Sequence, residues 1–346
     1  MQAALDAWEE RLRGLCDEIR ACARAAMRSA MDRGALHEVD RPVAEGAGDV
    51  SFGLDLPTEA VVTRWLEQRA RRSPLSLLSE ESGWRHLGPD PDAAHGAPIA
   101  LAGFDHGGPR IVVDPVDGTR NLMADLRPAW TALALCPPGP DQPRLSDVTY
   151  GLLAEIPDSR AARYRVLQAR AGGGASMEER DLERGRLVRA RPLVADGDDR
   201  ADHGYFPFFC FDAAMRPALA AVAAEFFARL EREERARVEH CFDDQYICNA
   251  GQLALLALGT YRLVADLRAA LLERVPAACT TSKPYDCAGA ILVARETGCI
   301  VTAPDGSQLD FPLDARTAVG FVGWANRATH ERLGPHLAAA LAARRQ

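Results

Sequence analysis

The chain has 346 residues, of which 47% are hydrophobic and 26% charged, and its formal net charge is −8 at pH 7. This composition is typical of a globular protein, and the length suits two packed lobes, since domains usually contain about 100–200 residues. The acidic surplus argues against nucleic-acid binding, which needs clustered Lys and Arg. Without an apolar run of about 18 residues or a signal or transit peptide pattern, we expect a cytoplasmic protein with no membrane partner.

The cysteines and histidines exclude two common kinds of site. The nine cysteines are odd in number and form no Cys-x-x-Cys pair, so reduced thiols are expected rather than a disulfide framework. The eight histidines form no His-x-His or His-x-x-x-His pair, which argues against a zinc hydrolase. The absence of a Gly-x-Ser-x-Gly motif removes the commonest serine-hydrolase signal.

The N-terminal half is predicted to combine helices with a mostly antiparallel sheet. Apolar periodicity and turn residues predict helices over 5–31 and 57–71, a long loop or loose hairpin over 86–109, and strands over 75–78, 111–113, 129–135, 147–154 and 164–169. Three glycines at 172–174 predict a turn rather than a phosphate loop, because no Gly-Lys-Ser/Thr follows them.

The C-terminal half is predicted to alternate helices and strands. A charged run at 177–185 is interpreted as the exposed connection between an N-terminal α+β lobe, residues 1–185, and a C-terminal α/β lobe, residues 186–346. In the second lobe we expect helices over 217–238, 252–258, 284–297 and from about 326, and strands over 261–265, 299–302 and 318–322.

The sequence Asp-Pro-Val-Asp-Gly-Thr at residues 114–119 is the strongest functional signal. It follows a buried strand, and α/β proteins place their sites at strand ends. Asp114 and Asp117 can point into one pocket while the Val116 carbonyl stays available, and oxygen ligands of this kind suit Mg²⁺. A plain turn with a helix cap is the alternative, but five fixed residues in six occur by chance in only about one in ten thousand chains of this size.

Three further acidic segments are weaker signals when taken singly. Glu80 and Glu81 follow a predicted strand, although adjacent acids are usually surface charge. Asp286 lies at the start of a predicted helix, where acids commonly complement the helix dipole. Asp49 and Asp55 lie in the segment 48–55 and are plausible loop or cap acids. Their order along the chain adds weight to each.

This ordered series resembles the inositol monophosphatase-like, lithium-sensitive phosphatases. The motifs that carry the resemblance are Asp-x-x-x-x-x-Asp, Glu-Glu-Ser, Asp-Pro-Val-Asp-Gly-Thr and Tyr-Asp-x-Ala-Gly, and they extend from about residue 48 to the Ala-Asn pair at 325–326. The resemblance implies a layered α-β-α-β-α sandwich of the inositol monophosphatase and fructose-1,6-bisphosphatase type, Mg²⁺ as cofactor and a homodimer. It also implies phosphomonoester hydrolysis by an activated water.

The resemblance also implies roles for individual residues. It assigns Glu80, Asp114 and the Val116 carbonyl to one metal, and Asp114, Asp117 and Asp286 to a second. It places Glu80 and Thr119, with Asp49 nearby, at the attacking water. Substrate contacts are implied for the Gly118 and Thr119 amides and for Asp286. Crowded carboxylates need such cations, because like charges raise one another's pKa.

The substrate is predicted less sharply than the chemistry. The segment 181–244 does not match the family pattern, and the segment 276–283 lacks the substrate-binding acid that inositol-specific members place there. We expect a small polyol or sugar phosphate, with 3′-phosphoadenosine 5′-phosphate and fructose 1,6-bisphosphate as alternatives. A protein of another class, which binds metal or phospholigand without turnover, is the remaining hypothesis. Further candidates are four basic residues for substrate contact, Arg120, Arg262, Arg268 and Lys283, and four aromatic residues for base stacking or the core, Tyr205, Phe206, Phe208 and Phe209.

Overall fold

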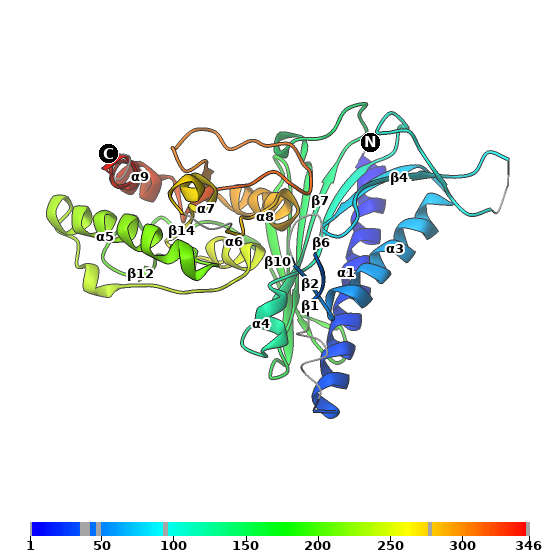
Figure 1. Ribbon diagram of the computed structural model, residues 1–346, viewed down its shortest axis with the longest axis horizontal. Helices are drawn as coiled ribbons and strands as arrows, with labels where there is room; N and C mark the ends of the chain where they lie inside the picture. Colours follow the sequence, from blue (N-terminus) through cyan, green and yellow to red (C-terminus); the bar gives the residue numbers. More distant parts are fainter. Residues whose placement is uncertain (1, 35–41, 46–49, 93–95, 276–278, 344–346) are drawn as a thin grey trace.

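A large mixed sheet organises the N-terminal half of the computed structural model, which describes residues 2–34, 42–45, 50–92, 96–275 and 279–343 (Figure 1). Its strand order is β11-β10-β9-β8-β7-β6-β3-β4-β5. The strands are β3 (Leu75–Ser79), β4 (Gly83–Gly88), β5 (Ile99–Ala100), β6 (Arg110–Asp117), β7 (Ala129–Cys136), β8 (Tyr150–Ile156), β9 (Arg163–Arg170), β10 (Gly174–Asp181) and β11 (Leu187–Leu193). Among the described strands of this sheet, β3 and β6 are the one parallel pair, so the predicted mostly antiparallel sheet is confirmed.

Two helices, α1 (Gln2–Asp32) and α3 (Asp55–Ala70), cover one face of this sheet (Figure 1). Buried residues of α1 such as Leu12, Leu15 and Ile19 recur every three or four positions, which gives the helix one apolar face. They share a core with Trp65 of α3 and Leu133 of β7. A short antiparallel pair, β1 (Pro42–Glu45) and β2 (Val50–Phe52), precedes α3.

The other face of the sheet packs against α6 (Asn249–Ala257) and α8 (Pro284–Thr297). Gly289 allows α8 to lie very close to β7, because a Cβ at this position would come within 2.1 Å of the Leu133 carbonyl oxygen. The helix ends at Gly298, whose φ of 105° is the left-handed conformation that suits glycine at a helix end. A helix of small residues therefore lies with its backbone against the sheet.

A second, smaller sheet and its helices complete the layers (Figure 1). Its antiparallel order is β14 (Leu263–Asp266), β16 (Phe321–Trp324), β15 (Ile300–Thr302), and α5 (Arg216–Glu233) and α9 (Arg327–Ala343) share a core with it. The shorter elements are α4 (Thr119–Met123), α7 (Arg268–Leu271) and the parallel pair β12 (Gly204–Tyr205) and β13 (Cys241–Phe242). The predicted layered α-β-α-β-α fold is confirmed.

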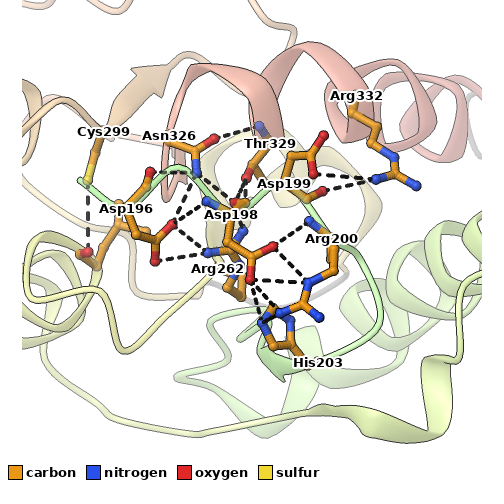
Figure 2. Close-up of polar contacts among 11 residues, drawn as sticks. Asp196, Asp198, Asp199, Arg200, His203, Arg262, Cys299, Asn326, Thr329 and Arg332 are labelled. Carbon is orange, nitrogen blue, oxygen red and sulfur yellow. Dashed lines mark hydrogen bonds and ion pairs between the residues drawn. The ribbon is translucent and has the colours of Figure 1, made fainter.

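A polar network joins the segment after β11 to the start of α9 (Figure 2). Arg262, which is 4% exposed, donates hydrogen bonds to both carboxylate oxygens of Asp196, at 2.9 and 3.1 Å. Asn326 donates to the carbonyl oxygens of Asp196 and Asp198, while its own side-chain oxygen accepts the Thr329 amide at 2.7 Å. Asn326 therefore caps α9, and Arg262, a candidate substrate contact, is committed to this network.

One expectation about local structure was wrong. The charged run at 177–185 is not an exposed connection, because it spans most of β10 and the turn into β11 at the edge of the large sheet. The stretch 86–109, predicted as a long loop or loose hairpin, contains the end of β4 and all of β5, which pair antiparallel. The division into lobes at residue 185 stays a prediction. Among the described residues, no helix combines the length and apolar character that crossing a bilayer requires.

Candidate active site

Most of the predicted site residues line one cavity of about 80 Å³. They are Glu80, Asp114, Val116, Asp117, Gly118, Thr119 and Asp286. The parallel pairing of β3 with β6 explains why Glu80 and Asp114 lie together, because Ser79 pairs with Val113 and both strands end at the same edge. Glu80 directly follows β3, and Asp114 begins the last part of β6, so both carboxylates emerge side by side.

Asp114 is the most buried of the carboxylates, with 3% of its surface exposed. Its Oδ1 accepts a hydrogen bond from the Val116 amide at 2.9 Å, which fixes the side chain over the Pro115 turn. Burial, followed by repulsion from Asp117, Glu80 and Asp286, raises its pKa well above the usual range. A neighbouring positive charge is therefore needed to keep Asp114 ionised at neutral pH.

Asp117 is held by the N-terminus of α6. Its Oδ2 accepts the Ala250 amide at 2.5 Å and the Cys248 thiol at 3.3 Å, and the same thiol also lies 3.2 Å from the Asp117 carbonyl oxygen. Burial raises the pKa of Asp117 to about 6 despite these hydrogen bonds. One carboxylate oxygen is thus engaged by protein donors.

Asp286 is supplied by α8, on the opposite side of the cavity. Its Oδ2 accepts the Lys283 amide at 2.8 Å, as expected for an acid in the first turn of a helix, and the Asn249 side-chain amide at 3.4 Å. Burial and then Asp117 raise its pKa well above the usual range. The close packing of Gly289 on β7 brings this carboxylate to the cavity.

Gly118 and Thr119 turn the chain from β6 into α4. Gly118 has a φ of 93°, and a Cβ there would lie 3.0 Å from Cys248 Cβ, so glycine is required on both counts. The Thr119 hydroxyl oxygen lies 3.0 Å from Asp55 Oδ1 and 2.8 Å from the Val116 carbonyl oxygen. Its single proton can be donated to only one of these acceptors at a time.

Among the described residues of the segment 48–55, Asp55, the first residue of α3, lines the cavity. Asp49, the residue predicted beside the attacking water, lies outside the described residues. The Asp-x-x-x-x-x-Asp pattern contains both acids, so the sequence already carried a signal for Asp55.

Five aromatic and basic residues that no sequence motif links also line the cavity, and we call them the outer wall. Phe209, Phe211, Arg120, Arg268 and Lys283 all line it. The Arg120 guanidinium lies 4.5 Å from the ring centre of Phe211, and that of Arg268 lies 4.1 Å from Phe209. Arg268 is 2% exposed and donates to both oxygens of fully buried Asp266.

The predicted aromatic residues of this region divide between core and surface. Phe206, Phe208 and Phe209 are buried, as the core interpretation requires, and Phe209 also lines the cavity. Tyr205 is 40% exposed and stands away from the cavity lining. Sequence reasoning missed Phe211, Cys248 and Asn249, whose positions depend on long-range packing rather than on a local pattern.

The donors in this cavity fit a hard divalent cation by their chemistry. Carboxylate and carbonyl oxygens are the ligands that Mg²⁺ prefers, and buried acids with raised pKa values call for positive charge. Within the described part of the chain, no group of three His, Cys, Asp or Glu side chains already has the arrangement that holds an ion.

Fold and cavity together define a class of phosphatase-like α/β proteins, and comparison with known families identifies which one. The model of the inositol monophosphatase family matches residues 18–342, so the chain belongs to this family. Membership supports a metal-dependent phosphatase. Comparison with curated protein sequences gives no significant match.

Solved structures with the same fold cover nearly the whole chain. The extragenic suppressor protein SuhB from Bartonella henselae has a TM-score of 0.61 at 16% identity, with 96% of this chain and 98% of that chain covered. Inositol monophosphatase from Anabaena (Nostoc) sp. PCC 7120 has a TM-score of 0.58 at 15% identity, covering 97% and 96%. A protein described as an inositol monophosphatase-fructose 1,6 bisphosphatase has a TM-score of 0.60 at 15% identity, covering 96% and 99%.

Proposed function

We propose that the protein is a Mg²⁺-dependent phosphomonoesterase that hydrolyses a small polyol or sugar phosphate. The observation that carries the proposal is the cavity itself, in which Glu80, Asp114, Asp117 and Asp286 come together from three separate parts of the chain. Burial of Asp114, Asp117 and Asp286 with raised pKa values has a clear cost, which supports a functional role for the group. Membership of the inositol monophosphatase family supports the same chemistry.

In this proposal the carboxylates and the Val116 carbonyl hold the cations, and the residues around Thr119 orient a water. Glu80, Asp114 and Val116 would bind one Mg²⁺, and Asp114, Asp117 and Asp286 a second. When bound, Mg²⁺ supplies the positive charge that activates water and stabilises the leaving oxygen. The Thr119 hydroxyl, backed by Asp55 at 3.0 Å, can accept a proton from that water while donating its own to the carboxylate.

The test is release of inorganic phosphate from a panel of small monoesters, with Mg²⁺ and with EDTA. Two neighbouring acids give a matched pair of variants, since Glu80 lines the cavity and Glu81 does not. Glu80→Gln should lower kcat at least about a hundredfold, whereas Glu81→Gln should stay near wild type. Equal activity of both variants, or full activity in EDTA, would contradict the proposal.

A protein that binds metal without turnover is the alternative from another class. It predicts no phosphate release across the panel, together with Mg²⁺ binding that Glu80→Gln weakens and Glu81→Gln does not. Calorimetric titration of Mg²⁺ on the same two variants separates this alternative from the enzyme.

A second substrate class is favoured by the outer wall of the cavity. Arg120 over Phe211 and the fixed guanidinium of Arg268 over Phe209 provide positive charge and aromatic faces in the cavity that the carboxylates line. Such a wall suits a substrate that carries a second anionic group, as fructose 1,6-bisphosphate and 3′-phosphoadenosine 5′-phosphate do.

Substitution of the outer wall decides between the two substrate classes. If the second anion binds there, Arg120→Gln should raise KM for bisphosphates about tenfold and leave monophosphates nearly unchanged. An equal change for both would assign Arg120 to the reacting phosphate or to structure.

A further inference from the structure

A second cavity, of about 840 Å³, lies along α1 and shares no residue with the carboxylate cavity. We call it the α1 cavity. Three arginines spaced one helical turn apart, Arg20, Arg24 and Arg28, line one side, and the segments around Ser159 and Leu182 line the other. Its volume falls in the range of about 300–1,000 Å³ that is usual for small-molecule sites. It belongs to the α1 and α3 layer, on the opposite face of the sheet from α6 and α8.

The arginines of the α1 cavity have donors that the protein leaves unsatisfied. Arg13, two turns before Arg20, is fully engaged: its Nε donates to Gln168 at 3.1 Å and its two Nη atoms donate to Glu178 at 3.1 and 2.9 Å. In contrast, Nη1 of Arg20 and Nη1 of Arg24 are buried without a hydrogen-bond partner in the described structure. A buried donor without a partner is costly, so these two atoms indicate a missing acceptor.

Arg20 is built into the cavity wall. It is 8% exposed, its guanidinium lies 3.7 Å from the ring centre of Tyr164, and its Nη2 pairs with Asp17. These contacts fix the plane of the guanidinium and leave Nη1 without a protein acceptor. The site is therefore preorganised on at least one of its three cations.

The positive charges of Arg20, Arg24 and Arg28 repel one another. Burial, followed by repulsion from Arg28 and Arg20, lowers the pKa of Arg24. Arginines four residues apart on a helix destabilise it unless an anion lies between them. The packing of three arginines at this spacing is thus unfavourable in the free protein.

The acidic residues near the cavity are already engaged or stand at its rim. Asp181 accepts the Glu183 and Arg184 amides at 3.2 and 2.8 Å, which closes the turn after β10. Asp158, the acid that faces Arg24, pairs with Arg160 at 3.2 Å. Glu183 is exposed. None of them takes the place of the missing acceptor at Arg24 Nη1.

From these contacts we propose that the α1 cavity binds a small phosphate-bearing anion through Arg20, Arg24 and Arg28. Phosphate oxygens match the guanidinium fork, and the volume leaves room for the rest of a phosphorylated metabolite. The Ser159 side of the cavity would face that remaining part. This inference does not depend on the proposed phosphatase activity.

The test is calorimetric titration of the whole chain with inorganic pyrophosphate in EDTA, where the metal-free carboxylate cavity repels anions. The double variant Arg24→Gln/Arg28→Gln spares Arg20 and should weaken binding about a hundredfold, about tenfold for each arginine. Arg11→Gln removes one positive charge from the same helix away from the cavity and should bind as wild type does. Thr119→Val, in the carboxylate cavity, should also leave binding unchanged.

Thermal unfolding provides the second readout. Without anion, the double variant should unfold at the same temperature as wild type or higher, because it loses two mutually repelling charges. Pyrophosphate should raise the Tm of wild type and of Arg11→Gln but not that of the double variant. The proposal is overturned if wild type does not bind pyrophosphate at millimolar concentration or if the double variant binds equally well. It is also overturned if the double variant unfolds earlier without anion, which would assign these arginines to structure.

Discussion

Neutralising Asp117 should make the metal-free protein more stable while it abolishes activity. Burial raises the pKa of this carboxyl group to about 6 in the folded protein, against a usual value of 3.8. A carboxyl group whose pKa is higher in the folded than in the unfolded protein contributes most to stability at pH values below its unfolded pKa. This contribution is lost as the pH rises through the pKa of the folded protein. The metal-free wild type should therefore lose stability between about pH 4 and pH 7.

The size of the effect follows from the shift in pKa. A difference of about two units at 1.36 kcal/mol each gives about 3 kcal/mol for the charged form, shared among carboxylates that titrate together. Asp117→Asn keeps an oxygen for the Ala250 amide and removes the charge. At pH 8 in EDTA its free energy of unfolding should exceed that of wild type by about 3 kcal/mol, or about 4 °C in Tm for a chain of this length. At pH 4 the two should coincide.

The assay is thermal unfolding followed by circular dichroism across this pH range, in EDTA and then in Mg²⁺. Asp314 provides a control of opposite sign: although partial burial opposes it, hydrogen bonds from Thr317 and Arg316 lower its pKa. Asp314→Asn should therefore lose stability at pH 8. If Asp117→Asn is less stable than wild type at pH 8 without metal, or if the difference does not change with pH, the electrostatic reasoning fails. Added Mg²⁺ should stabilise wild type more than Asp117→Asn.

The remaining predictions concern catalysis, metal affinity and packing. Thr119→Val should lower kcat about a hundredfold, while Thr119→Ser should stay within about tenfold of wild type. The double variant Thr119→Val/Asp55→Asn should lose little more kcat than the worse single variant, because the two side chains act as a pair. Calorimetric Mg²⁺ affinity should weaken as pH falls through about 6, where Asp117 takes up a proton; a flat profile would contradict this. Gly289→Ala should destabilise by about 3 kcal/mol in denaturant titration, since its Cβ would meet a β7 carbonyl at 2.1 Å. Gly14→Ala, with nothing within 4 Å, should stabilise α1 by about 0.5–1 kcal/mol.

The residues that could be predicted from sequence are those fixed by short-range geometry. Asp114, Asp117, Gly118 and Thr119 lie within six residues at the end of one strand, so their common location follows from local backbone structure. The position of Asp286 in the first turn of a helix was predicted from local pattern, whereas its place in the site was implied only by the family resemblance. In each case the residues that form the sequence pattern lie within one short segment of the structure.

The residues that could not be predicted depend on long-range packing or on an ambiguous pattern. The position of Asp55 in the cavity depends on α3, which begins at this residue and packs on the large sheet. Strand β10 was predicted as a linker because it carries many charges beside the edge strand β11, and a charged run also characterises a linker. Cys248 and Phe211 enter the cavity from segments whose own sequence carries no signal of function.

The position of α8 late in the chain has a consequence for folding during synthesis. Asp114 and Asp117 are made well before Asp286, so the cavity is complete only when α8 docks on β7 through Gly289. Docking of α8 is the step that brings the Asp286 charge beside those of Asp114 and Asp117. A divalent cation present as the ribosome releases the chain would ease that step, so the supply of metal should influence how much of the protein matures as well as how fast it works.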